Sequence, residues 1–135
     1  MRIGIVGAGM AGLSCAQELQ RRGHDPVLFD KGRGPGGRMS TRRIDTPLGE
    51  AAFDHGAQYL TARDPAFVAQ VERWADAGHV ARWPAAGPDA WVGTPAMNAP
   101  IRAMAQRCDV RWNTRVETLH HDGDWRIGEE RFSGG

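Results

Sequence analysis

The sequence predicts an α/β fold that begins with a parallel βαβ unit. Arg2 to Val6 is a short apolar run that ends at a glycine, which is typical of a strand. Residues 10–22 show helical spacing of apolar positions, and Gly23 is placed to end that helix. Residues 26–30 (PVLFD) predict a second strand. A right-handed crossover would make the two strands parallel neighbours.

A glycine motif joins the first predicted strand to the helix. The sequence GAGMAG places Gly7 in the tight turn, Gly9 where the backbone must approach a ligand, and Gly12 where the helix packs on the strand. The amides at the helix start stabilise a pyrophosphate, and Asp30 ends the second strand, where a carboxylate accepts hydrogen bonds from ribose hydroxyls. This pattern predicts a Rossmann-like fold for FAD or NAD(P), without separating the two cofactors.

The next elements are shorter and more irregular. Residues 31–43 are rich in glycine and basic residues and predict a loop, with a short helix beginning near Gly37. Residues 53–61 hold a short strand. Asp64 followed by Pro65 predicts the start of a helix that ends at Gly78.

The last third of the chain predicts mixed structure. Short extended pieces surround Trp83 and Trp91, and a helix covers about residues 96–107. Residues 110–112, 115–119 and 125–127 predict strands, and Asp122-Gly123 predicts the hairpin turn before the last of these strands.

Composition excludes several classes of protein. The chain has 135 residues and a net charge of +1, so no strong field favours nucleic acid. No apolar run approaches the length that spans a bilayer. Cys15 and Cys108 are far apart, which argues against a disulfide and for a reducing, cytoplasmic location. The adjacent His120 and His121 and the remote cysteines give no metal-ligand spacing.

Three segments in order carry a resemblance to a known family. They are DKGRGPGGRMSTRR at 30–43, FDHGAQYLTARD at 53–64 and WVGTPAM at 91–97. The chain from Arg2 to about Ile127 resembles the bacterial renalase-like FAD-dependent oxidoreductases, which are relatives of the flavin amine oxidases. The resemblance implies that FAD is the cofactor.

The resemblance also implies positions for the cofactor. The FAD pyrophosphate would lie on the 7–12 turn, the adenosine ribose on Asp30, and the isoalloxazine ring on the GAQY segment. The full set of cofactor-binding residues is Gly7, Ala8, Gly9, Met10, Ala11, Gly12, Asp30, Lys31, Gly36, Gly37, Arg38, Met39, Gly56, Ala57, Gln58, Tyr59 and Val116. Val116 would meet the adenine through its backbone. Arg38 would supply charge-assisted bonds to the diphosphate. No catalytic residue and no metal ligand is assigned.

Members of this family are considerably longer than this chain. We therefore expect the sequence to be the N-terminal portion of a truncated FAD-binding domain. Residues of about 1–60 and 110–127 would form its dinucleotide-binding part, and residues of about 61–109 would begin the substrate-domain insertion. Gly135 follows soon after a predicted hairpin. Truncation would leave apolar faces that bear Leu13, Leu28 and Phe67 exposed, and an incomplete sheet edge would favour self-association.

Three functional hypotheses follow. The first is an FAD-dependent oxidoreductase, or its N-terminal fragment, that transfers a hydride from a small-molecule substrate to flavin and is reoxidised by oxygen. The resemblance leaves dihydropyridine nucleotides and amines as substrate classes. The second is an NAD(P)-binding Rossmann protein, in which Gly36-Gly37-Arg38 and the GAQY segment would have no role. The third is an inactive fragment without turnover.

Overall fold

The structure is a computed structural model that describes residues 1–133. Gly134 and Gly135, on which part of the truncation hypothesis rests, lie outside the described residues. The chain forms two compact units. Unit 1 combines residues 1–35 with the described residues from 104 onward, and unit 2 comprises residues 36–103.

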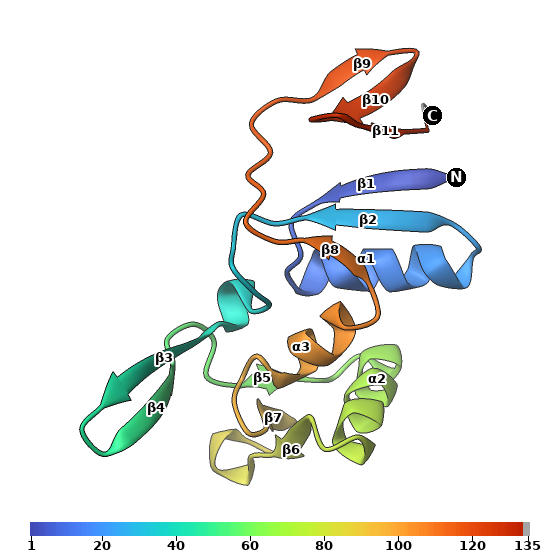
Figure 1. The fold of residues 1–135 in the computed structure, drawn as a ribbon. Coiled ribbons are helices and arrows are strands. Elements are labelled where there is room, and N and C mark those ends of the chain that lie inside the picture. Colours follow the sequence, from blue (N-terminus) through green and yellow to red (C-terminus); the bar gives the residue numbers. More distant parts are fainter. Residues whose placement is uncertain (134–135) are drawn as a thin grey trace. The chain divides into compact units, whose positions relative to one another are not determined.

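Unit 1 contains the predicted βαβ start, which confirms the α/β, Rossmann-like fold class. Its strands β1 (Arg2–Val6), β2 (Asp25–Phe29) and β8 (Asp109–Arg111) form a parallel sheet in the order β1-β2-β8. Helix α1 (Met10–Arg21) covers one face of this sheet (Figure 1). Gly23 has a φ of 81°, and its N–H donates to the carbonyl of Gln20, as expected of a residue that ends a helix.

An antiparallel meander covers the other face of the sheet. It consists of β9 (His120–Asp122), β10 (Asp124–Ile127) and β11 (Glu130–Phe132), in the order β11-β10-β9 (Figure 1). Val27, Phe29, Ile127 and Phe132 form a buried apolar cluster between the two layers. The rings of Phe29 and Phe132 meet edge to face at 5.7 Å. A Cβ on Gly4 would lie 2.9 Å from Cδ1 of Ile127, so the small residue leaves room for the meander.

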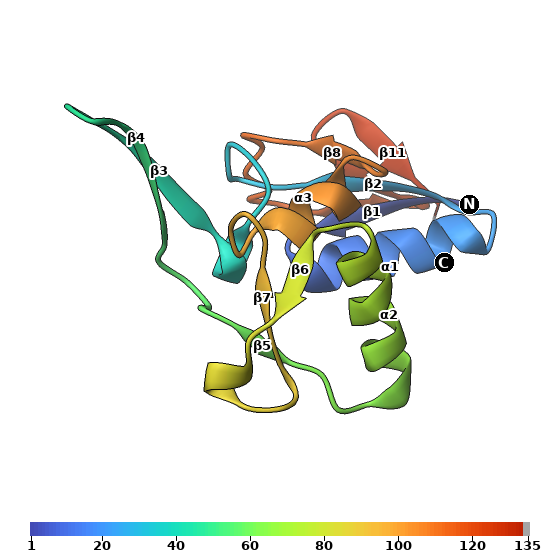
Figure 2. The ribbon, with the colours of Figure 1, turned by 90° about the horizontal axis from the view of Figure 1, so that it is seen from below.

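Unit 2 begins with a short 3₁₀ turn, η1 (Gly37–Met39), and an antiparallel hairpin of β3 (Thr41–Thr46) and β4 (Gly49–Asp54). The hairpin projects from η1 as a two-stranded ribbon (Figure 2). A small antiparallel sheet follows, formed by β5 (Leu60–Thr61), β7 (Ala90–Gly93) and β6 (Val80–Arg82) in that order. The remaining elements are α2 (Pro65–Asp76), η2 (Pro84–Ala86) and α3 (Ala99–Ala105).

Helix α2 shows how local sequence fixes an element. The side chain of Asp64 accepts hydrogen bonds of 3.0 Å from the backbone N–H groups of Ala66 and Phe67. Pro65 occupies the first turn, where its missing N–H costs no hydrogen bond. Val71 and Trp74 form the buried face of the helix. Both the N-cap and the proline agree with the prediction.

Several predictions need correction. Residues 115–119 contain no strand, because they form an irregular connection from β8 to the meander. The helix predicted for about 96–107 is limited to Ala99–Ala105. Leu13 and Leu28 are fully buried and Phe67 is half-buried, so the apolar faces expected to be exposed are covered. Among the residues described, no helix is long and apolar enough to span a bilayer.

Candidate dinucleotide-binding site

The glycine motif forms a tight turn between β1 and α1. Gly7 has a φ of 101°, a conformation that side-chain-bearing residues rarely adopt. A Cβ on Gly12 would collide with the carbonyl oxygen of Gly7, so only glycine lets the first turn of α1 approach the end of β1 this closely. Ala8, between them, is buried. The roles of Gly7 in the turn and of Gly12 in helix–strand packing match the prediction from spacing.

The N-terminus of α1 is chemically suited to an anion. Gly9 is the N-cap, and among the described residues no side chain caps the helix there. The first turn contains no acidic residue, so no carboxylate of that turn competes for the N-terminal amides. A Cβ placed on Gly9 would meet nothing within 4 Å, which leaves open space beside the backbone. These features fit a phosphate group bound by helix amides.

Asp30 is the acid at the end of β2, and its carboxylate holds two backbone segments. Its Oδ2 accepts a hydrogen bond of 2.7 Å from the N–H of Ala8, and its Oδ1 accepts one of 2.7 Å from the N–H of Gly32. Asp30 is half-buried. A carboxylate has about four acceptor positions, so these two bonds leave acceptor capacity for ribose hydroxyls. The contact with Ala8 was not predicted.

A second turn lies in unit 2, where two predicted segments come together. Gly36 is buried and precedes η1. The N–H of Ala57 donates a hydrogen bond of 2.8 Å to the carbonyl of Arg38, and a Cβ on Gly56 would collide with that same carbonyl oxygen. The structure therefore brings the GGRM segment against the GAQY segment. The Arg38 side chain remains exposed and available to an anion.

Asp54 is a residue that the sequence did not single out. Its Oδ1 accepts hydrogen bonds from the hydroxyl of Thr41 at 2.6 Å and from the N–H of Met97 at 3.1 Å. These contacts connect the three segments that carry the family resemblance. No local pattern indicates this role, because the partners are distant in sequence. The resemblance alone could have suggested that the segments meet.

The remaining predicted residues are placed as follows. Lys31 and Gln58 are exposed, Met39 is half-buried, and Tyr59 is 45% exposed and stacks edge to face on Trp83 at 5.6 Å. Val116 is partly buried and packs against the apolar cluster of unit 1. Unit 1 thus holds the 7–12 turn, Asp30, Lys31 and Val116, and unit 2 holds 36–39 and 56–59. Within residues 1–133, no three His, Cys, Asp or Glu side chains group as a metal site.

The family model described as an NAD(P)-binding Rossmann-like domain matches residues 5–76, more than half of the chain. The chain belongs to this family. The match includes the glycine turn, Asp30 and the second turn of unit 2, which are the features described above.

Two curated relatives match a shorter stretch of the chain at higher identity. An L-amino acid oxidase from Cerastes cerastes is 50% identical over 44 residues, which is 33% of this chain and 8% of the oxidase. A zeta-carotene-forming phytoene desaturase from Myxococcus xanthus is 46% identical over 44 residues, again 33% of this chain and 8% of the desaturase. The matched stretches therefore span a small part of these relatives.

Solved structures share the fold over nearly the whole chain. The crystal structure of FqzB has a TM-score of 0.58 at 17% identity and is matched over 98% of this chain and 34% of its own. The crystal structure of CtdE in complex with FAD and substrate 4 has a TM-score of 0.57 at 17% identity, over 98% and 35%. The chain spans about a third of these proteins, and the likeness concerns the fold.

Proposed function

We propose that the chain is the FAD-binding portion of an FAD-dependent oxidoreductase. One observation carries the proposal: the glycine turn presents the uncapped N-terminus of α1 beside open space, with Asp30 at the end of the adjacent strand. The oxidase and desaturase relatives and the FAD complex of CtdE support FAD as the dinucleotide. The second turn at 36–39 adds a cationic group that a flavin diphosphate would use.

In this proposal each segment holds a defined part of the cofactor. The amides after Gly9 bind the pyrophosphate, and Asp30 accepts hydrogen bonds from the adenosine ribose. Arg38 contributes a planar guanidinium that pairs with phosphate oxygens. Residues 56–59 line the flavin ring, and the backbone of Val116 faces the adenine. Residues of about 1–60 and 110–127 would form the dinucleotide-binding part, and residues of about 61–109 would begin a substrate domain.

Bound FAD supplies the capacity to accept a hydride from a substrate carbon. The protein's contribution is to bind and orient the cofactor. We propose a dihydropyridine nucleotide or an amine as the hydride donor, with oxygen as the final acceptor. The renalase-like resemblance supports this choice of substrates. A cytoplasmic location is also proposed, supported by Cys15 and Cys108, which are both free thiols.

A direct test is equilibrium titration of the purified chain with FAD and, separately, with NADH. We expect saturable quenching of flavin fluorescence and a perturbed flavin absorption spectrum, with weaker binding of NADH. Gly12→Val, which closes the turn, should abolish FAD binding. Gly34→Ala is the matched control, since its Cβ would meet nothing within 4 Å.

The same titration separates the alternatives. Preferential binding of NADH would favour an NAD(P)-binding Rossmann protein, in keeping with the name of the matching family model. Absence of binding to both ligands by a folded chain would favour an inactive fragment. If FAD binds, anaerobic mixing with a dihydropyridine nucleotide or an amine identifies the donor class, because only the correct donor bleaches the flavin absorption.

A further inference from the structure

A turn at residues 112–114 follows β8 directly and lies beside the loop that follows β2. The two strands are parallel, and Phe29 at the end of β2 lies opposite Arg111 at the end of β8. The chain therefore leaves the sheet at the same edge in both places (Figure 1). Because Asp30 is the next residue after Phe29, the turn is a neighbour of the carboxylate that is proposed to bind ribose.

Three backbone hydrogen bonds join the loop after β2 to this segment. The N–H of Asp30 donates to the carbonyl of Arg111 at 3.0 Å, and the N–H of Thr114 donates to the carbonyl of Asp30 at 2.8 Å. The N–H of Asn113 donates to the carbonyl of Gly32, also at 2.8 Å. The backbone of Asp30 is therefore held by both of its polar groups, and the loop is held again two residues later.

The side chain of Asp30 depends on the same loop. Its Oδ1 accepts a hydrogen bond of 2.7 Å from the N–H of Gly32, and its Oδ2 accepts one of 2.7 Å from the N–H of Ala8. Gly32 is thus bonded to the carboxylate through its N–H and to Asn113 through its carbonyl. A movement of the turn would therefore reach the carboxylate through Gly32 and through the backbone of Asp30.

Asn113 has an unusual backbone conformation. Its φ is 55°, and it is the one non-glycine residue with a positive φ in the part of the chain that the structure describes. Asparagine adopts this left-handed conformation more readily than most residues, and a β-branched residue rarely does. The Asn113 side chain is exposed, so the conformation does not come from side-chain packing. The hydroxyl of Thr114 donates to the carbonyl of Trp112 at 3.0 Å and closes the turn. A rare conformation that neighbouring bonds maintain points to a function.

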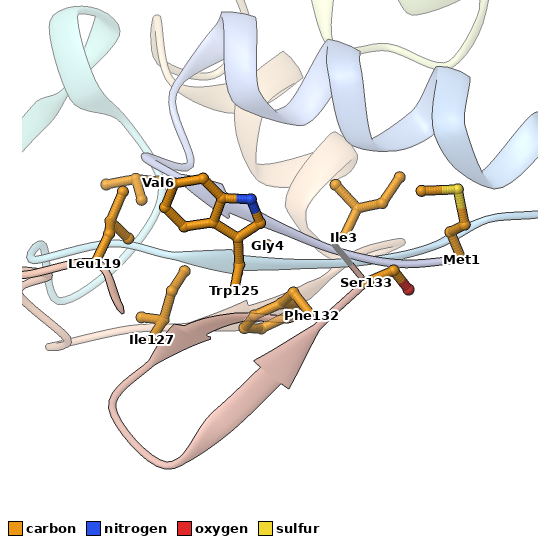
Figure 3. A pocket seen from close by; sticks show the side chains of 9 residues that line it. All are labelled: Met1, Ile3, Gly4, Val6, Leu119, Trp125, Ile127, Phe132 and Ser133. Carbon is orange, nitrogen blue, oxygen red and sulfur yellow. The ribbon is translucent and has the colours of Figure 1, made fainter. Parts of the chain in front are cut away.

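The apolar pocket of unit 1 is a separate feature. It has a volume of about 400 Å³ and is lined mainly by residues of β1 and the meander (Figure 3). The side chains of Val6, Leu119 and Ile127 in this lining offer no acceptor for ribose hydroxyls. None of the lining residues belongs to 30–32 or 112–114. The turn therefore serves the Asp30 loop and not this pocket.

We propose that Asn113 is a positioning residue for recognition of the adenosine ribose, an inference that rests on the proposed function. Its left-handed backbone directs its N–H to Gly32, and this bond holds the carboxylate of Asp30 where ribose hydroxyls can donate to it. The role belongs to the backbone of Asn113 and requires no contact between its side chain and the ligand. A residue that opposes this conformation lowers the population of the binding arrangement, and the affinity falls in proportion.

The test compares two probes by isothermal titration calorimetry. They are ADP and 2′,3′-dideoxy-ADP, which lacks both ribose hydroxyls. The parent chain should bind ADP about tenfold more tightly, as expected of hydrogen bonds to a carboxylate. Asn113→Val should weaken ADP binding about tenfold, to the affinity of the dideoxy probe, because valine opposes the left-handed backbone. Binding of the dideoxy probe itself should not change.

Two further variants make the comparison specific. Asn113→Gly should retain both the affinity for ADP and the preference for it, because glycine adopts a positive φ freely. Gln106→Val is the matched control, since Gln106 is also exposed in a turn of unit 1 but has no positive φ, and it should behave as the parent chain does. General damage to the fold would weaken both probes equally and leave their ratio unchanged, which would overturn the inference.

Hydrogen exchange of the parent chain provides a second measurement that does not depend on a variant. Saturation with ADP should slow exchange at the amides of Gly32, Asn113 and Thr114, and saturation with the dideoxy probe should slow it less. Unchanged exchange at Asn113 and Thr114 would overturn the inference. So would an Asn113→Val chain that keeps the parental preference, or an Asn113→Gly or Gln106→Val chain that loses it.

The outcomes also separate this inference from the proposed function. A parent chain that binds neither ADP nor FAD would overturn both. A parent chain that binds FAD, but does not bind ADP or does not prefer it to the dideoxy probe, would overturn the inference alone.

Discussion

The carboxylate of Asp30 accepts a hydrogen bond of 2.7 Å from the backbone N–H of Ala8, and this bond ties the end of β2 to the glycine turn after β1. The same side chain holds the N–H of Gly32 through its other oxygen. Asp30 therefore has a structural role before any ligand binds. The residue expected to recognise ribose also shapes the turn that would receive the pyrophosphate.

Replacing Asp30 tests its structural role. Asp30→Ala removes both acceptors, and we expect a loss of about 1–3 kcal/mol in the free energy of unfolding. Asp30→Asn retains one acceptor oxygen and should lose less. Urea denaturation checks both values. Asp25→Ala is the control, since Asp25 lies at the other end of β2 with a side chain that is 74% exposed. Equal effects of the Asp30 and Asp25 variants would contradict the prediction.

Gly12 limits how closely α1 approaches β1. Gly12→Val would place a side chain against the carbonyl of Gly7 and force the turn to move. We expect a loss of about 1–3 kcal/mol from overpacking and a lower thermal midpoint. Gly34→Ala, which meets open space, should unfold at nearly the parental temperature. A Gly12→Val chain with unchanged stability would contradict the packing described for this turn.

Asp54 connects the base of the β3–β4 hairpin to the segment before α3. Asp54→Ala leaves the hydroxyl of Thr41 and the N–H of Met97 without this acceptor. We expect faster hydrogen exchange at Met97 and a loss of about 1–3 kcal/mol. Asp45→Ala is the control, because it removes the carboxylate of an exposed residue from the same hairpin. The prediction fails if both variants exchange at the parental rate.

Stability should depend on pH through Glu18 in α1. Side-chain hydrogen bonds from Arg21 and then Arg22 lower the pKa of Glu18 from 4.5 to about 2. Because the folded pKa lies below the unfolded one, the contribution is fully present above pH 4.5 and is lost as pH falls toward about 2. The side chain of Glu18 is 44% exposed, so salt should weaken the effect. NMR titration of the Glu18 carboxyl, with Glu18→Gln as control for the stability curve, checks this window.

The two cysteines should differ in reactivity. Cys15 is exposed on α1, whereas Cys108 is partly buried and burial raises the pKa of its thiol. Less thiolate and less access both slow alkylation of Cys108. Peptide mass spectrometry after brief treatment with iodoacetamide should find Cys15 modified first. Faster modification of Cys108 would contradict the burial of that side chain.

Elements with strong local signals could be predicted from the sequence. The glycine turn, helix α1 and the Asp64-Pro65 start of α2 each depend on residues that are close in the chain. The strand expected at 115–119 was wrong, because its apolar positions serve a connection in which Val116 packs on unit 1. The pairing of Glu130–Phe132 with β10 was also missed, since this charged segment has no alternating pattern.

The candidate site also combines features that could be predicted from the sequence with features that could not. Spacing predicted the roles of Gly7 and Gly12, which depend on neighbouring backbone. Spacing could not predict that Gly56 lies against Arg38 or that Asp54 reaches Met97, because those contacts join segments far apart in the chain. The segments were predicted to belong to one site only through the family resemblance.

Unit 1 is formed by two stretches that are separate in the sequence, and this should affect the order in which the units fold during synthesis on the ribosome. Unit 2 is a single continuous stretch, residues 36–103. In contrast, β2 of unit 1 can pair with β8 only after Asp109–Arg111 has been synthesised. Chains emerge from the amino end, and contacts distant in sequence form late. We therefore expect the inserted stretch to fold before the segments that flank it. A nascent chain that is stalled when residue 103 has left the ribosomal exit tunnel, but β8 has not, should already protect unit 2 from protease while β1 and β2 remain susceptible.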